Sequence, residues 1–203
     1  MIDPKKYTGT NVFVNLRNIT DPKRLEKAES TLSAYKLAQF YNNPSVIGEL
    51  GKDFNFDLAH LKAIHKYLFQ DLYTWAGEIR SYDMKIDTDI FTPANDITYW
   101  AGEIAKEIKN DGYLCNATDR EIIVKKVARY LGLLGMLHPF SEGNGRTQRA
   151  FLWQLTLNAD YRLDWSKVHS WENTATAQNV HRYQDYTGME SMIDRILTPI
   201  HRT

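Results

Sequence analysis

Apolar residues along most of the chain recur at steps of three and four positions, the spacing of an amphipathic helix. The first such segment follows Asp21-Pro22, the second starts near Asp57 and is expected to end at Gly77, and the third runs from Asn95 to Gly112. The apolar stripes comprise Leu25, Ala28, Leu32 and Tyr35 in the first segment, Leu58, Leu61, Ile64, Leu68 and Leu72 in the second, and Ile97, Ala101, Ile104 and Ile108 in the third.

A fourth segment differs because it is apolar on every side. It opens with Thr118-Asp119-Arg120-Glu121, which has the form of a capping box, and it then carries Val127, Leu131, Leu133, Leu134, Met136 and Leu137. A helix that is apolar all round is a buried helix, so we expect this one at the centre of the fold. Two more helices are expected, one over about 145–157 and one after Thr187-Gly188-Met189-Glu190.

One segment breaks the helical spacing. Tyr82, Met84 and Ile86 alternate with polar residues, Asp87-Thr88-Asp89 is a turn signal, and Ile90-Phe91-Thr92 resumes the apolar run. This pattern predicts a short β-hairpin. Since no repeat or flexible linker divides the sequence, we expect a single domain over residues 1–203, an all-α bundle around a buried central helix with one small hairpin.

Composition narrows the classes of function. The chain has 203 residues, of which 43% are hydrophobic, and it carries 25 basic and 25 acidic side chains. A net charge of zero argues against sequence-independent binding to nucleic acid or to a membrane surface. The single cysteine suits a reducing compartment, and the polar start lacks the apolar stretch of a signal peptide. We therefore expect a cytoplasmic protein with neither nucleic acid nor membrane as a partner.

The residues most typical of chemistry lie between the fourth and fifth helices, from His138 to Arg149. Pro139 disfavours helical geometry at the residue before it, so the buried helix should end at His138. The segment Gly143-Asn144-Gly145 can adopt positive φ and turn its N–H groups inward at the start of the next helix. A helix N-terminus also adds partial positive charge, so this turn predicts an anion site.

Three charged side chains give that anion site a more specific chemistry. Arg146 and Arg149 are three apart and share a face of the helix, and two guanidinium groups favour a di- or triphosphate. Glu142 supplies a carboxylate, and Mg²⁺ is commonly held by one or two carboxylates together with substrate phosphates. The segment therefore indicates a site for phosphoryl or nucleotidyl transfer.

The stretch from His138 to Arg149 resembles, without a mismatch, the signature of the Fic-domain family, His-Pro-Phe-x-Asp/Glu-Gly-Asn-Gly-Arg-x-x-Arg. Residues 72–80, Leu-Tyr-Thr-Trp-Ala-Gly-Glu-Ile-Arg, look like the family's segment before its hairpin, and the core of the resemblance covers about 57–157. The resemblance implies an all-α domain that transfers AMP from ATP, with Mg²⁺, to a Ser, Thr or Tyr hydroxyl of a target protein.

The resemblance also implies a role for each residue of the loop. His138 would be the base that deprotonates the target hydroxyl, Phe140 would anchor the loop in the core, and Glu142 would bind Mg²⁺. Gly143, Asn144 and Gly145 would hold the α- and β-phosphates, Arg146 would neutralise the phosphate chain and Arg149 would reach its distal end. The flap that docks the target would consist of Lys85, Ile86, Asp87, Thr88, Asp89, Ile90, Phe91 and Thr92.

Members of this family often carry an inhibitory helix with the pattern Ser/Thr-x-x-x-Glu-Gly/Asn, whose glutamate pairs with the second arginine of the signature. The nearest matches, Ser45 to Glu49 and Thr74 to Glu78, both lack the required final residue. The chain thus resembles stand-alone toxins or regulators that a separate small antitoxin protein restrains. Two alternatives stay open: a catalytically weak module that binds a nucleotide or a partner, and transfer of a different phosphate-containing group.

Overall fold

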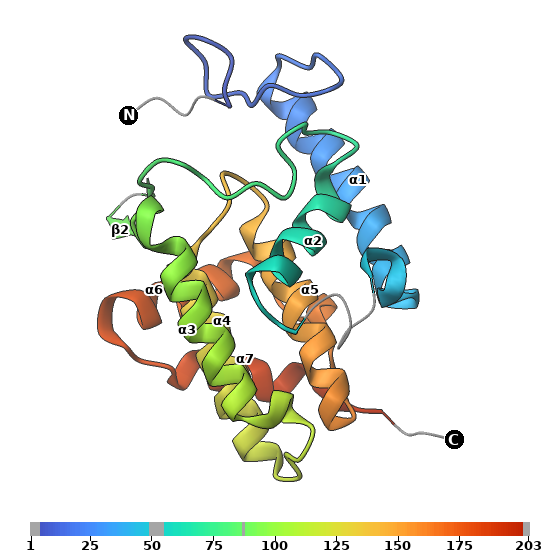
Figure 1. Cartoon of the computed structure of the whole chain (residues 1–203), viewed down its shortest axis with the longest axis vertical. Coiled ribbons are helices and arrows are strands. Elements are labelled where there is room, and N and C mark those ends of the chain that lie inside the picture. Colours follow the sequence, from blue (N-terminus) through green and yellow to red (C-terminus); the bar gives the residue numbers. More distant parts are fainter. Residues whose placement is uncertain (1–4, 49–54, 87, 201–203) are drawn as a thin grey trace.

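The computed structural model describes residues 5–48, 55–86 and 88–200, which are mainly helical (Figure 1). The longer helices are α1 (Pro22–Asn42), α2 (Leu58–Phe69), α3 (Ile97–Asn110), α4 (Arg120–Leu137), α5 (Asn144–Thr156), α6 (Ser170–Tyr183) and α7 (Thr187–Ile196). Short 3₁₀ turns are η1 (Pro44–Ile47), η2 (Ala94–Asp96), η3 (Gly112–Leu114), η4 (Leu157–Ala159) and η5 (Trp165–Lys167). Two small antiparallel ribbons pair β1 (Lys85–Ile86) with β2 (Asp89–Ile90), and β3 (Tyr161–Leu163) with β4 (Leu197–Pro199).

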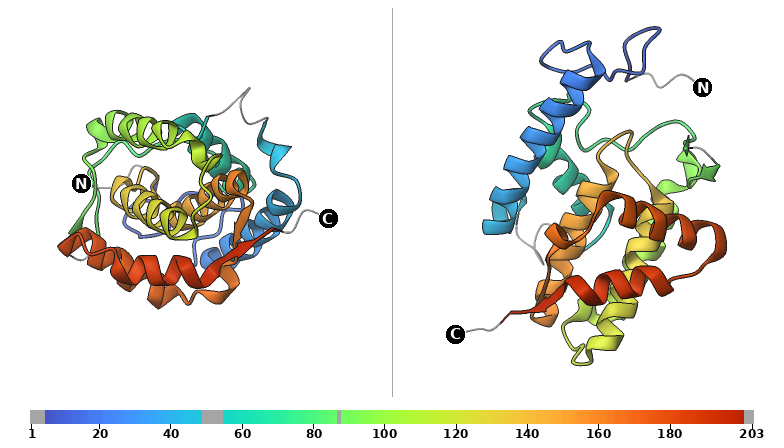
Figure 2. Two further views of the ribbon diagram at one scale, coloured as in Figure 1. Left: turned by 90° about the horizontal axis from the view of Figure 1, so that it is seen from below. Right: turned by 180° about the vertical axis from the view of Figure 1, so that it is seen from behind.

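Helix α4 is the centre of the bundle, as its all-round apolar sequence predicts. It contacts α3, α5, α6 and α7, which surround it in the view along its axis (Figure 2, left). Ile123, Val127 and Leu134 are buried on it. The hydrophobic core continues from α4 through α5 into α2, and it includes residues from Val12 to Leu197.

The predicted starts of the helices are correct to within a few residues, but two predicted caps are not. Asp119, not Thr118, caps α4, and its side chain accepts from the N–H of Glu121. Helix α7 begins at Thr187, whose N–H donates to Asp185, so Thr187 is the first helical residue and not the cap. In both cases the side chain of an aspartate, Asp119 or Asp185, accepts from a free main-chain N–H at the start of the helix.

Helix α2 is shorter than its apolar stripe predicts. It ends at Phe69 rather than at Gly77, and the chain then turns back, with the carbonyl of Leu72 accepting from the N–H of Leu16. Leu72 is nevertheless buried. The apolar spacing continues past the end of the helix because the turn packs into the same core.

The predicted apolar face of helix α1 is confirmed in part. Leu25 is buried and Ala28 and Leu32 are half-buried, whereas Tyr35 is 62% exposed. The buried face also includes the polar residues Glu29 and Ser33, which contact Arg146 in the first turn of α5.

The predicted hairpin is present but short. Lys85 pairs with Ile90 and Ile86 with Asp89, and the turn residue Asp87 lies outside the described residues. Asp89 is buried, while Ile86 and Ile90 are half or more exposed. The hairpin thus points a carboxylate inward and two apolar side chains outward.

The sequence analysis misses α6 and the ribbon of β3 and β4. Helix α6 buries only Thr176 and Val180, so its sequence has no clear apolar stripe. It lies against α4 and the hairpin, and it closes one side of the site described next (Figure 2, right).

Candidate active site

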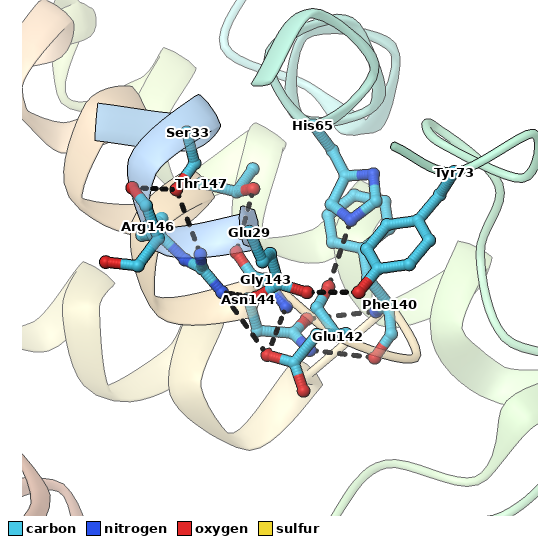
Figure 3. A network of polar contacts seen from close by, with 11 residues as sticks. Glu29, Ser33, His65, Tyr73, Phe140, Glu142, Gly143, Asn144, Arg146 and Thr147 are labelled. Carbon is cyan, nitrogen blue, oxygen red and sulfur yellow. Dashed lines mark hydrogen bonds and ion pairs between the residues drawn. The ribbon is translucent and has the colours of Figure 1, made fainter. Parts of the chain in front are cut away.

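The loop that joins α4 to α5 is held in one conformation by the side chain of Asn144. The Asn144 oxygen accepts from the N–H of Phe140 at 2.9 Å, and its amide nitrogen donates to the carbonyl of Phe140 at 2.7 Å (Figure 3). Both ends of the buried Asn144 side chain are therefore engaged with the backbone of Phe140.

His138 is the C-cap of α4 and the last residue whose N–H joins the hydrogen bonds of that helix. Its N–H donates to Leu134, and its own backbone is left-handed, with φ 42°. Nδ1 lies 3.3 Å from the carbonyl of Gly135. Since a carbonyl only accepts, Nδ1 carries the proton and Nε2 presents a lone pair. Burial lowers the pKa of His138 to about 4, so the ring is neutral near pH 7 and is able to accept a proton.

Phe140 anchors the loop against a histidine that the sequence analysis did not single out. Its ring is 1% exposed and stacks on His65 at 4.0 Å between centroids. Nδ1 of His65 accepts from the N–H of Gly77 at 2.8 Å, so Nε2 is the protonated nitrogen that donates to the carbonyl of Glu142 at 3.0 Å. Burial lowers the pKa of His65 to about 3. His65 is therefore a neutral structural support for the loop.

Gly143 makes the turn into α5 possible. Its φ is 78°, and a Cβ at this position would lie 2.4 Å from the ring of Phe69, so no other residue fits. Gly145, by contrast, is already helical, and only the first of the two glycines uses positive φ.

The first turn of α5 leaves backbone donors for an anion. The N–H groups of Asn144, Gly145 and Arg146 have no helical partner, because the first bond of the helix runs from Thr147 to Gly143. Within the described residues no side chain accepts from them either. Free donors of this kind, together with the helix dipole, are the features that an anion site uses.

The two arginines of the loop have different surroundings. Arg146 is engaged: NH1 donates to Ser33 at 3.0 Å, NH2 pairs with Glu29, and the guanidinium lies 4.8 Å from the ring centre of Phe69. Arg149 has no carboxylate partner in the part of the chain that the structure describes. Burial lowers the pKa of Arg149, with Tyr41 as a neighbour. Its charge is poorly solvated and uncompensated, which favours an incoming anion.

Glu142 lies at the mouth of the loop, and its side chain is 43% exposed. Oε1 accepts from the N–H of Gly143 at 2.8 Å and lies 3.5 Å from NH2 of Arg146. Partial burial and the nearby Glu29 carboxylate raise the pKa of Glu142. Oε2 has no partner among the described residues, so one oxygen is open to a cation.

Arg80 connects the loop to the base of the hairpin. The side chain is 1% exposed and donates to the carbonyls of His138 at 2.8 Å and Tyr82 at 2.7 Å, and to that of Thr92. Its main-chain N–H donates to Pro139 at 2.8 Å. A single buried guanidinium thus fixes the hairpin relative to His138.

The hairpin covers one side of His138. The ring of Phe91 lies 4.1 Å from that of His138, and Asp89 accepts from Arg182 of α6 at 2.8 Å. This hydrogen bond lowers the pKa of Asp89. A cavity of about 330 Å³ lies between the hairpin, α4, α5 and α6, and its lining includes His138, Gln148 and His181.

The seven predicted site residues from His138 to Arg149 lie between the end of α4 and the second turn of α5; His138 and Gly145 line one cavity, and Glu142 and Arg146 line another. Four further residues hold them: Glu29, His65, Tyr73 and Arg80. The pattern of residues 72–80 includes Tyr73 and Arg80. Glu29 and His65 have no local signal, because their roles depend on partners 117 and 77 positions away.

Comparison with known proteins agrees with this geometry. A model of the Fic/DOC family matches residues 55–156, half of the chain. The chain therefore belongs to the Fic/DOC family.

Two of its relatives are named as protein adenylyltransferases or probable ones. The protein adenylyltransferase VbhT of Bartonella schoenbuchensis is 37% identical over 97% of this chain, which spans 39% of VbhT. The probable protein adenylyltransferase Fic of Escherichia coli K12 is 29% identical over 97% of this chain and 92% of its own length. The crystal structure of BepC from Bartonella tribocorum, with bound AMPPNP, has a TM-score of 0.88 at 23% identity and covers 97% of both chains. The likeness to BepC shows a shared fold.

Two further features concern a membrane and a metal ion as partners. No helix in the described part of the chain is long and apolar enough to cross a membrane. Among the same residues, no group of three or more His, Cys, Asp or Glu side chains could hold a metal ion by itself. A cation at Glu142 would therefore need further ligands from a substrate.

Replacement of Arg80 tests how strongly the loop depends on it. We expect Arg80→Met to lower the free energy of unfolding by about 3 kcal/mol or more, because several buried carbonyls each lose a donor worth about 1–3 kcal/mol. The exposed Arg24 is the control, and Arg24→Met should stay within about 0.5 kcal/mol. Urea unfolding measures both, and equal losses in the two variants would contradict the anchoring role.

Proposed function

We propose that this chain is a protein adenylyltransferase, which transfers AMP from ATP to a Ser, Thr or Tyr hydroxyl of a target protein. One observation carries the proposal: a neutral histidine with a free lone pair lies in the same short segment as the donors of a helix N-terminus and an arginine that has no carboxylate partner among the described residues. The names of the relatives support the same reaction.

The proposed reaction assigns one task to each part of the loop. The target hydroxyl oxygen bonds to the α-phosphorus, and its proton passes to Nε2 of His138. The bond from the α-phosphorus to the bridging oxygen breaks, and pyrophosphate leaves. The N–H groups of Asn144, Gly145 and Arg146 would bind the α- and β-phosphates, and Arg149 would bind the distal phosphate. Such a transfer requires positioning and charge stabilisation rather than a covalent intermediate.

The loop also fits a magnesium ion. Glu142 has one carboxylate oxygen without a protein partner, and Mg²⁺ typically takes one or two carboxylates together with substrate phosphates. In that position Mg²⁺ would neutralise charge on the phosphate chain. Glu142 is the residue of this chain that would hold it.

The hairpin is the proposed docking site for the target. Phe91, next to the hairpin strand β2, lies against the ring of His138, and the apolar side chains of Ile86 and Ile90 are exposed. An extended segment of the target could add to the hairpin by main-chain pairing. This would place its hydroxyl beside Nε2.

Labelled ATP tests the proposed reaction. In a cell lysate with Mg²⁺, the wild type should transfer label from the α-phosphate of ATP to a protein, and His138→Ala should be at least about 100-fold slower because the base is lost. The exposed His169 is the control, and His169→Ala should keep full activity. Equal labelling by His138→Ala and the wild type would exclude His138 as the base. Label from the γ-phosphate alone would indicate a kinase.

The pKa of His138 predicts how the rate depends on pH. The folded protein holds this pKa near 4, below the ordinary 6.5, so the ring stays neutral as the pH falls through 6.5. We expect kcat/KM to stay within about twofold between pH 8 and 5.5, where an unperturbed histidine would already be mostly protonated. Circular dichroism at each pH confirms that the protein is folded. A rate that halves near pH 6.5 would contradict this environment for His138.

We also propose that a separate small protein restrains the enzyme in the cytoplasm. Arg149 has no carboxylate partner in the described residues, and Glu78 of the second inhibitory match pairs instead with Lys5 at 3.8 Å. The first match, Ser45 to Glu49, ends outside the described residues. Purification of the tagged chain from its native host should recover a small inhibitory protein. Recovery of none, together with full activity of the chain in that host, would contradict this.

A further inference from the structure

Two carboxylates face one guanidinium beside the phosphate site. NH2 of Arg146 forms an ion pair with Oε1 of Glu29, and the same nitrogen lies 3.5 Å from Oε1 of Glu142 (Figure 3). The Glu29 contact is the closer of the two. The side chain of Glu29 is 11% exposed, whereas that of Glu142 is 43% exposed. Arg146 therefore pairs with both carboxylates, closely with the buried Glu29 and at a longer distance with the open Glu142.

Glu29 is itself held firmly. Its second oxygen, Oε2, accepts from the hydroxyl of Tyr73, whose side chain is 1% exposed. One turn along α1, Ser33 accepts from NH1 of Arg146 at 3.0 Å, and the ring of Phe69 lies under the guanidinium. Three partners on two helices thus fix Arg146: Phe69 on α2, and Glu29 and Ser33 on α1, outside the residues 55–156 that match the family model.

We propose that Glu29 is a positioning residue that takes the closer contact with Arg146 and so limits how tightly Arg146 pairs with Glu142, which leaves the Glu142 carboxylate available to a divalent cation. Glu142 lies in the loop just before α5 and its Oε1 is already 3.5 Å from Arg146, so little movement would bring the two charges into full contact. Without Glu29, the guanidinium would close on Glu142 and occupy its oxygens. The inference rests on the proposed binding of Mg·ATP at this loop.

A positioning role of Glu29 changes the Mg²⁺ dependence of nucleotide binding, whereas general damage to the fold would weaken binding with and without Mg²⁺ alike. Glu29→Gln keeps the shape of the side chain but removes the charge that holds Arg146. The dependence of nucleotide binding on Mg²⁺ should weaken by about 10-fold, the scale found when a residue that orients a metal ligand is lost. Binding without Mg²⁺ should be unchanged or tighter, because one negative charge near the phosphates is gone.

Titration of a non-hydrolysable ATP analogue, with and without Mg²⁺, measures both effects by calorimetry on the full chain. Glu121 of α4 is the control, because its side chain is 74% exposed and pairs with Lys125 on the surface, and Glu121→Gln should change neither affinity by more than about twofold. Tyr73→Phe removes only the hydroxyl that holds Oε2 of Glu29. It should shift the Mg²⁺ dependence in the same direction by a smaller factor, and it serves as the second variant if Glu29→Gln fails to fold.

The decisive variant carries two changes. If Glu29 acts through Arg146, Glu29→Gln should have no further effect on the Mg²⁺ dependence in an Arg146→Met background. Equal weakening with and without Mg²⁺, no change at all, or an effect that persists without Arg146 would each overturn the inference. The readout is binding, so a chain that binds Mg·nucleotide but transfers no AMP would refute the proposed function and leave this inference standing.

Discussion

The buried guanidinium of Arg80 joins three parts of the molecule that a transfer reaction needs in fixed relation. Its hydrogen bonds go to main-chain carbonyls at the end of α4, in the loop that follows and at the base of the hairpin. Carbonyls at a helix C-terminus carry partial negative charge, so they suit a buried cation. If one of these segments moved alone, the buried cation would lose acceptors and the carbonyls their donor, and each loss is costly. The segments therefore keep one arrangement, and His138 is part of it.

The two arginines of the site, Arg146 and Arg149, differ in whether a carboxylate compensates their charge. The chain is neutral overall, yet Glu29 compensates Arg146 while Arg149 is left without a carboxylate among the described residues. The free N–H groups at the start of α5 add uncharged donors. The proposed affinity for an anion therefore rests on Arg149 and a helix end, whereas the side chain of Arg146 is paired with two carboxylates.

The sequence indicates the loop, its chemistry and the buried helix before it, because these depend on residues that are close together in the chain. Pro139 ends α4, and Gly143 permits the turn into α5. The apolar residues on all sides of α4 predict its central position in the bundle. The polar part of the inward face of α1 could not be predicted, since Glu29 and Ser33 are buried by a partner more than a hundred positions away. Helix α6 could not be predicted because it buries only two of its residues. Helix α2 ends early at a turn in which the carbonyl of Leu72 accepts from the distant N–H of Leu16.

A crystal structure of the chain with a non-hydrolysable ATP analogue and Mg²⁺ tests the central claim most directly. That claim is a loop arranged in advance, in which Arg149 and the α5 donors bind phosphate while Arg146 stays with Glu29. We expect the distal phosphate at Arg149, the inner phosphates at the N–H groups of Asn144, Gly145 and Arg146, and Mg²⁺ on Glu142, with the pair of Arg146 and Glu29 intact. A nucleotide bound elsewhere, or Arg146 released from Glu29 to hold the phosphates, would contradict it.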